Sequence, residues 1–211
     1  MGIFENFRRF IKKKVDKISK QKICEKLKRM KLQKIGPIEV EIVENDERKC
    51  MKMNFTYTFI ADYHQSDQQY EQQYMILWEH TKANEAESER IDIKILPVGT
   101  QNPFERIKLS AKLLKDSWFL SCIQSEKEGD YQRKGFWTIM MIAFFDIVDV
   151  ESSVKKIEGN LEPAMKIRGA KRFYRSFSGY EDDKKLIEYD LQKRNKIEYC
   201  IISKSQKGNA P

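Results

Sequence analysis

The sequence has few of the residues that catalytic and cofactor-binding sites need. It holds only two histidines, His64 and His80, in 211 residues, and its nine glycines are spread thinly along the chain. No glycine-rich phosphate loop of the Walker or dinucleotide-binding kind can be drawn. Neither histidine stands beside a motif that would orient it as the base for a nucleophile. We therefore expect a protein that is not an enzyme and that binds no cofactor.

Cysteine is also scarce. Cys24, Cys50, Cys122 and Cys200 each stand alone beside apolar residues, without the closely spaced ligand pairs of a structural zinc site. A small disulfide-stapled domain would carry more cysteines in fewer residues. We expect no metal site and four reduced, partly buried thiols, which is the usual state in an intracellular, reducing compartment.

Long apolar runs are missing as well. The longest is residues 139–145, whereas a helix that spans a bilayer needs about 20 apolar residues. The N-terminus lacks the unbroken apolar stretch of a secretory signal, but its basic, amphipathic pattern partly matches a mitochondrial targeting helix, with Arg8 and Arg9 beside Phe7 and Phe10. We expect no transmembrane span, and the matrix side of the mitochondrion is the favoured location.

Positive charge is concentrated at the start of the chain. Residues 1–34 hold thirteen Lys and Arg against three acids, a balance of +10. Since the whole chain carries +8, the remaining 177 residues sum to −2. Such a basic arm indicates an anionic partner or an anionic membrane surface, although a solvated helix with a lysine-rich outer face would show the same pattern. The expected contact residues are Arg8, Arg9, Lys12, Lys13, Lys14, Lys17 and Lys20.

A second basic segment covers residues 164–180, where aromatic side chains lie among the bases and no acid precedes Glu181. Such a segment can hold phosphates and stack on unpaired bases. The alternative is a basic surface loop whose aromatic side chains return to the core. The residues expected to contact phosphate or nucleic acid are Lys166, Arg168, Lys171, Arg172, Arg175 and Tyr174.

Hydrophobic periodicity predicts an α+β fold. Residues 3–30 carry an apolar stripe at helical spacing, which Gly36-Pro37 ends. Strict alternation predicts strands, and the strand expected over Met51–Phe59 is the clearest. A largely antiparallel sheet with helices packed on one face follows from this order. The other strands are expected at residues 38–42, 74–78, 91–95, 117–124 and 197–202, with a loop or extended hairpin over 62–73.

Four further segments are assigned from their residue patterns. Apolar steps of three and four residues predict a helix over residues 104–114, and the run over 135–148 is apolar on both faces, as in a strand covered on both sides. The segments 151–158 and 181–195 are expected to be helical. The chain is divided into a basic helical arm (1–34), an α+β core domain (35–150) and a mixed C-terminal extension (151–211).

Three residues, Asp146, Asp149 and His80, keep an enzymatic alternative open. Asp146 and Asp149 close the apolar run, and a carboxylate near a core could serve acid–base chemistry if burial raised its pKa. Strand-end acids are more often solvated. An enzyme that uses Asp146 or His80 is therefore the third-ranked hypothesis.

One stretch resembles a known family. A basic helix ends in Ile35-Gly36-Pro37-Ile38-Glu39-Val40, and strands follow at Met51–Phe59 and Tyr74–Trp78. This order is similar to the core of the mitochondrial proteins that link inner-membrane import to cytochrome oxidase assembly, over about residues 20–96. Those proteins carry a membrane anchor before the helix, which we do not expect in this chain. The resemblance implies a non-catalytic assembly role at the inner membrane and carries no binding residue across.

The leading hypothesis is therefore a non-enzymatic accessory subunit or assembly factor of a larger complex, such as a mitochondrial inner-membrane respiratory assembly. Its partners would be other protein subunits. The excess of Trp and Tyr, which concentrate at protein contacts, supports this hypothesis. The alternative is an RNA-binding component of an organellar ribonucleoprotein, for example a mitochondrial ribosome.

Overall fold

The computed structural model describes residues 21–44, 47–65, 68–85, 87–99, 104–125, 135–160, 173, 186–190 and 202–203. It is an α+β fold built on a large, mostly antiparallel sheet, as the sequence predicts. A helix over residues 21–29 precedes the sheet. No helix in the described part of the chain is long and apolar enough to cross a membrane.

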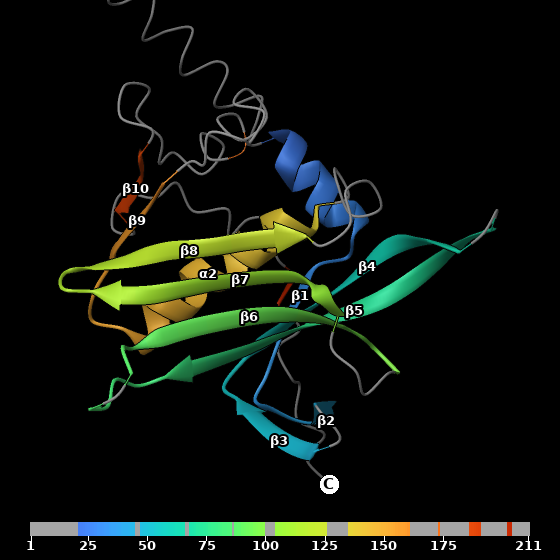
Figure 1. Cartoon of the computed structure of the whole chain (residues 1–211). Coiled ribbons are helices and arrows are strands. Elements are labelled where there is room, and N and C mark those ends of the chain that lie inside the picture. The colour runs from blue at the N-terminus through green and yellow to red at the C-terminus, as the bar shows by residue number, and fades with distance from the viewer. Residues whose placement is uncertain are drawn as a thin grey trace, which may run out of the picture.

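Nine strands form the main sheet (Figure 1). The central five, β4 to β8, run antiparallel to their neighbours in chain order. The order across the sheet is β10-β9-β8-β7-β6-β5-β4-β1-β11, and among the strands that the structure describes only β8–β9 and β1–β11 are parallel pairs. The strands are β1 (Gln33–Ile35), β4 (Thr56–Gln65), β5 (Gln68–Thr81), β6 (Arg90–Pro97), β7 (Phe104–Leu114), β8 (Ser117–Ser125), β9 (Lys156–Asn160), β10 (Leu186–Asp190) and β11 (Ile202–Ser203).

Helix α2 (Phe136–Glu151) lies against one face of this sheet and contacts β5 and β6 (Figure 1). Ten of its sixteen residues are buried, which is the pattern of a helix enclosed on all sides. Aromatic rings join it to the sheet: the Phe136 ring packs edge-on against Phe59 at 5.3 Å and Tyr74 at 5.1 Å. Burying a side chain of this size contributes roughly 1.5–3 kcal/mol.

The two faces of the sheet differ in composition because side chains alternate along each strand. On β6, Ile91, Ile93 and Ile95 are fully buried on the face that α2 covers. Asp92 and Lys94 lie between them and point to the opposite face, where they are partly exposed. Over β6 and β7 the sheet thus has a buried apolar face and a partly exposed polar one, the open face. On β5 the second face is covered, since Leu77, the register partner of Lys94, is buried.

A separate two-stranded sheet pairs β2 (Ile38–Glu44) with β3 (Glu47–Met53). Lys49 on β3 binds Glu79 on β5 at 2.8 Å, and Ile42 and Met53 belong to the same core as the main sheet. The hairpin is therefore attached to the main sheet by both an ion pair and apolar contact.

Two predicted elements are wrong in type. Residues 104–114 form strand β7 and not a helix, because the buried residues Ile107, Leu109 and Ala111 follow a period of two. Residues 135–148 belong to helix α2 and not to a central strand. A run that is apolar on every face has no period to read, and its length suits a helix better than a strand.

Smaller corrections concern the flanking segments. The single strand expected over Met51–Phe59 is divided between β3 and β4, with a bend at Asn54. The predicted helix over 151–158 is wrong, since β9 begins at Lys156. Leu186–Asp190 is a strand and not helical. The predicted connection over 62–73 is an extended hairpin between β4 and β5.

Candidate functional site

The contact residues predicted from the sequence lie outside the described part of the chain. This holds for the seven basic residues of the arm, Arg8, Arg9, Lys12, Lys13, Lys14, Lys17 and Lys20, and for the second set, Lys166, Arg168, Lys171, Arg172, Tyr174 and Arg175. The side chain of His64 is also outside it. These assignments remain predictions. The described part of the basic arm begins with the helix over residues 21–29.

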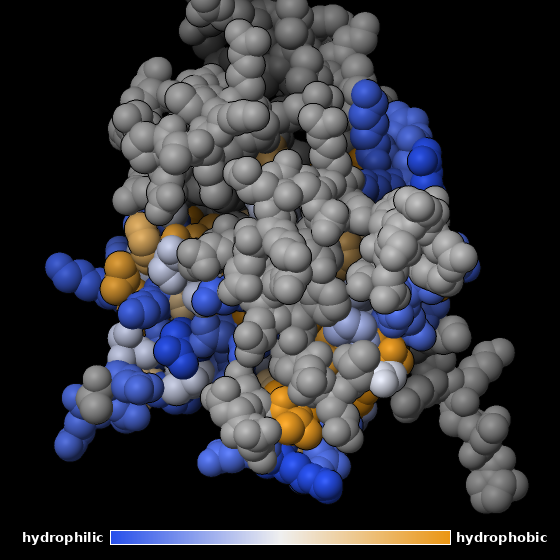
Figure 2. Space-filling view, turned by 45° about the vertical axis from the view of Figure 1, so that its right-hand side comes forward, coloured by the Kyte–Doolittle hydropathy of each residue, from blue (hydrophilic) through white to orange (hydrophobic). Residues whose placement is uncertain are grey.

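That helix is amphipathic, and it separates charge from apolar surface. Leu27 and Met30 are buried at 1% and 6% exposure, whereas Lys22, Lys28 and Arg29 are exposed. Figure 2 shows hydrophilic side chains gathered at the upper right, over this helix. Glu25 is exposed on the same side, so the helix presents three bases and one acid with a net charge of +2. We define its basic face as Lys22, Lys28 and Arg29.

The apolar stripe of the helix is already occupied by the body of the protein. Leu27 and Met30 belong to the main core, and the backbone N–H of Ile60 on β4 donates to the Met30 carbonyl at 2.7 Å. A helix that lies on a membrane inserts its apolar stripe among the lipids. Since this stripe is buried, the described helix offers a partner its charge alone.

Lys26 sits at the edge of the buried stripe. Its side chain passes so close to Gly135, at the start of α2, that a Cβ there would lie 2.9 Å from Lys26 Cε. Partial burial lowers the pKa of Lys26 below its usual value. The absence of a side chain at Gly135 thus allows the helix to pack directly on the start of α2.

A further set of basic residues, on the open face of the sheet, is not among the sites predicted from the sequence. Arg90 and Lys94 on β6 and Lys108 and Lys112 on β7 share this face. The available signal was the alternation of charged residues with buried isoleucines along β6. On β7 the same alternation is ambiguous, because the apolar residues of 104–114 also fit the spacing of a helix.

Asp146, one of the two candidate catalytic residues, lies within α2 and not at a strand end. Its Oδ2 atom lies 3.0 Å from Lys34 Nζ of β1 and also accepts a hydrogen bond from the Tyr57 hydroxyl of β4. The Lys34 ammonium lies over the Phe55 ring at 4.0 Å. Asp146 thus joins α2 to two strands through a charge-assisted contact, which is a structural role.

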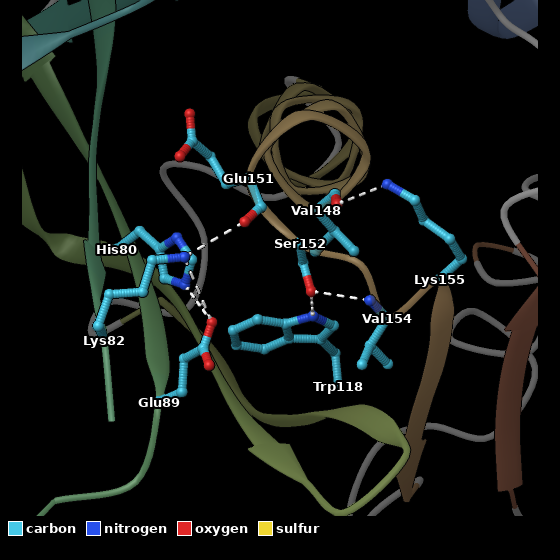
Figure 3. Close-up of polar contacts among 9 residues, drawn as sticks. All are labelled: His80, Lys82, Glu89, Trp118, Val148, Glu151, Ser152, Val154 and Lys155. Carbon is cyan, nitrogen blue, oxygen red and sulfur yellow. Dashed lines mark hydrogen bonds and ion pairs between the residues drawn. The ribbon is translucent and has the colours of Figure 1, made fainter. Parts of the chain in front are cut away.

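His80, the other candidate, lies beneath the C-terminal end of α2 (Figure 3). Its Nε2 atom is 2.7 Å from Glu89 Oε1, and only 4% of its side chain is exposed. The ring packs edge-on against Trp118 at 5.7 Å. Its Nδ1 atom is buried without a hydrogen-bond partner. A general base must reach the proton that it removes, and burial of this ring gives it the role of a packed core group.

The C-terminal end of α2 is held by several polar side chains around this histidine (Figure 3). The Trp118 indole N–H donates to Ser152 Oγ at 3.0 Å. Lys82 donates to the Glu151 carbonyl at 3.3 Å and Lys155 to the Val148 carbonyl at 3.2 Å. Cations at the C-terminus of a helix satisfy its last carbonyls and interact favourably with its dipole. This cluster therefore fixes the position of α2.

The cysteines differ from the expectation in one respect. Cys24 is disulfide-bonded, so the prediction of four reduced thiols is wrong at this position. Cys50 is a free, exposed thiol that donates to Glu39 Oε1 at 2.7 Å. This hydrogen bond raises the pKa of Cys50 and lowers that of Glu39.

Within the described ranges, no group of three or more His, Cys, Asp or Glu side chains could hold a metal ion. Comparison with known protein families, curated proteins and solved structures gives no match. The resemblance to the mitochondrial import and oxidase-assembly proteins therefore remains a prediction.

Proposed function

We propose that this protein is a non-enzymatic accessory subunit or assembly factor of a larger complex, which it joins through the basic face of its N-terminal helix. The observation that carries the proposal is the separation of buried apolar side chains from exposed basic side chains on this helix. Its apolar stripe is buried in the core, while Lys22, Lys28 and Arg29 face outward. A helix held in this way presents fixed positive charges to an acidic protein surface, and charge complementarity of this kind steers and orients a partner.

The distribution of charge along the chain supports the same proposal. Residues 1–34 carry a net charge of +10 and the rest of the chain carries −2. In the field of an acidic partner this asymmetry turns residues 1–34 toward the partner. Asp146 and His80 are both engaged within the fold, Asp146 by Lys34 and His80 by Glu89, which is compatible with a role that does not use them as catalytic groups. A mitochondrial inner-membrane respiratory assembly remains the proposed setting.

The test is the native mass of the endogenous protein, measured on a blue-native gel with mass spectrometry of the band. We expect migration in a large assembly whose other members include an acidic subunit. Migration near 25 kDa, the mass of the chain, in freshly solubilised mitochondria and in whole-cell extract would contradict the proposal.

A pair of matched variants connects the assembly to the helix. Lys28→Gln with Arg29→Gln removes two charges from the basic face. Arg48→Gln with Lys52→Gln removes two from the hairpin, where both side chains are about four-fifths exposed. We expect the first variant to leave the assembly at lower salt than the wild type and the second to behave like the wild type, since exposed charges act through a screened field.

A further inference from the structure

The open face of β6 and β7 carries an unusual arrangement of charge. This face is turned toward the viewer in Figure 1, with α2 behind the sheet. Among the side chains of β6 and β7 that the structure describes, four bases and one acid lie on it, which gives a net charge of +3. We define the sheet-face patch as Arg90, Lys94, Lys108 and Lys112.

The strand register places like charges directly opposite each other. Arg90 pairs with Lys112, and Lys94 pairs with Lys108. Asp92 lies between the two pairs, opposite Ser110. Its Oδ2 atom lies 2.5 Å from Arg90 Nε. Its Oδ1 atom accepts a hydrogen bond of 2.5 Å from the Ser110 hydroxyl. The Asp92 carboxylate is therefore already engaged by both of these neighbours.

Directly opposed like charges destabilise a sheet. Asp92 offsets part of this repulsion at the Arg90–Lys112 pair, and an anion laid across the strands would attract the cations of both pairs. Along β6 the two pairs are four residues apart, about 13 Å at roughly 3.3 Å per residue. A ligand that meets both pairs must therefore carry several negative charges along an extended chain.

An aromatic ring adjoins the patch. Phe119 of β8 lies opposite Lys112 in the sheet. It is partly exposed, whereas its neighbours Trp118 and Leu120 are buried on the other face. Arg90, Lys112 and Phe119 therefore form one row across three strands, with two cations on one side of a partly exposed ring. Glu158 of β9 lies on the other side of the ring, where Lys156 and Ser117 engage its carboxylate.

We propose that the sheet-face patch binds single-stranded nucleic acid, with phosphates on the opposed cation pairs and a base stacked on Phe119. Positively charged surfaces with aromatic rings are the common means of binding single strands, because every base offers a face for stacking. An acidic protein surface would use the cations but has no such need for the ring. The inference rests on different residues from the basic helix and does not require the proposed function.

The test measures binding of the full-length protein to a labelled single-stranded RNA of about 12 nucleotides, within the usual site size, by fluorescence anisotropy at several salt concentrations. Lys108→Gln with Lys112→Gln is expected to weaken binding about tenfold. It should also reduce the slope of log K against log salt by about 1.4, since each phosphate contact on a single strand contributes about 0.7. The matched control, Arg48→Gln with Lys52→Gln, should bind like the wild type.

Phe119→Leu separates stacking from charge. It should weaken binding about fivefold or more and leave the salt slope unchanged, because a stacked base releases no counterion. Thermal melting of each variant verifies the fold.

Several results would overturn the proposal. Wild-type affinity in the Lys108→Gln, Lys112→Gln variant, or an equal loss in the hairpin control, would show that the patch is not the site. Loss of RNA affinity only in the Lys28→Gln, Arg29→Gln variant would assign the RNA to the helix instead. Equal competition by polyglutamate and by unlabelled RNA would indicate an acidic protein as the partner of the patch.

Discussion

Lys34 of β1 and Asp146 of α2 form an ion pair of 3.0 Å that links an edge-proximal strand to the central helix. Tyr57, which is fully buried, donates its hydroxyl to the same carboxylate. We predict that Asp146→Ala destabilises the protein by about 1–3 kcal/mol, because it deprives both donors of this acceptor. Lys34→Met should cost less than about 1 kcal/mol, since a third of the lysine side chain is exposed. Urea unfolding of both variants and of the double variant measures this, and strictly additive losses would contradict the coupling.

Glu89 should be needed for stability although it lies in a loop. We predict that Glu89→Ala costs about 1–3 kcal/mol, because it leaves the buried Nε2 atom of His80 without its partner. Glu85→Ala removes an exposed acid from the same loop and should change the melting temperature little. Equal melting of the two variants would show that the His80 contact contributes nothing.

Cys50 should react slowly for an exposed thiol. The Glu39 carboxylate raises the pKa of Cys50, so less of the nucleophilic thiolate is present at a given pH. We predict that Glu39→Gln speeds alkylation of Cys50 by iodoacetamide at pH 8 several-fold, as measured by peptide mass spectrometry. Glu47→Gln serves as the control in the same hairpin and should leave the rate unchanged.

Lys26 gives a pH dependence whose sign can be stated. Burial lowers its pKa in the folded state below that of the unfolded chain, so the unfolded state binds more protons and stability rises with pH between the two values. We predict that Lys26→Met raises the melting temperature at pH 7, because it removes the cost of burying the ammonium. The difference should shrink as the pH rises toward the ordinary lysine pKa of 10.5. A gap that stays constant up to pH 10 would argue against burial of the ammonium as its cause.

Gly36 should tolerate no side chain. A Cβ atom at this position would lie 2.4 Å from the Asn54 carbonyl oxygen and 2.6 Å from Phe55 Cα, both of them backbone atoms. Gly36→Ala is expected to cost at least about 1–3 kcal/mol, as overpacking does. Gly99→Ala is a useful comparison, because its Cβ would meet no atom within 4 Å and only its positive φ opposes the change. Chemical denaturation should rank Gly36→Ala well below Gly99→Ala.

The sequence predicted those elements whose periodicity was unambiguous. Ile91, Ile93 and Ile95 alternate with polar residues, so β6 could be predicted as a strand with one buried face. In β7 the apolar residues fit both a period of two and steps of three and four, and only pairing with β6 decides between them. For α2 no period exists, because the sheet and the rest of the core bury it on all sides.

The candidate sites differ in the same way. The basic character of the arm is local in sequence, and the described helix shows it at Lys28 and Arg29. The sheet-face patch depends on which residues oppose each other across two strands. No reading of one segment gives such a register, so Arg90 and Lys112 could be recognised as neighbours only in the folded protein.

The pairing of β1 with β11 has a consequence for the order of assembly during synthesis. Gln33 lies beside Ile202, so the partner of the first strand leaves the ribosome 169 residues later. At roughly 5–20 residues per second this takes about 10–30 s. During that interval β4 and β5 can pair locally, while the far side of β1 must wait. A newly made chain therefore exposes an unpaired edge of β1 until residues 202–203 have emerged, and an unpaired strand edge is a template for pairing with another chain.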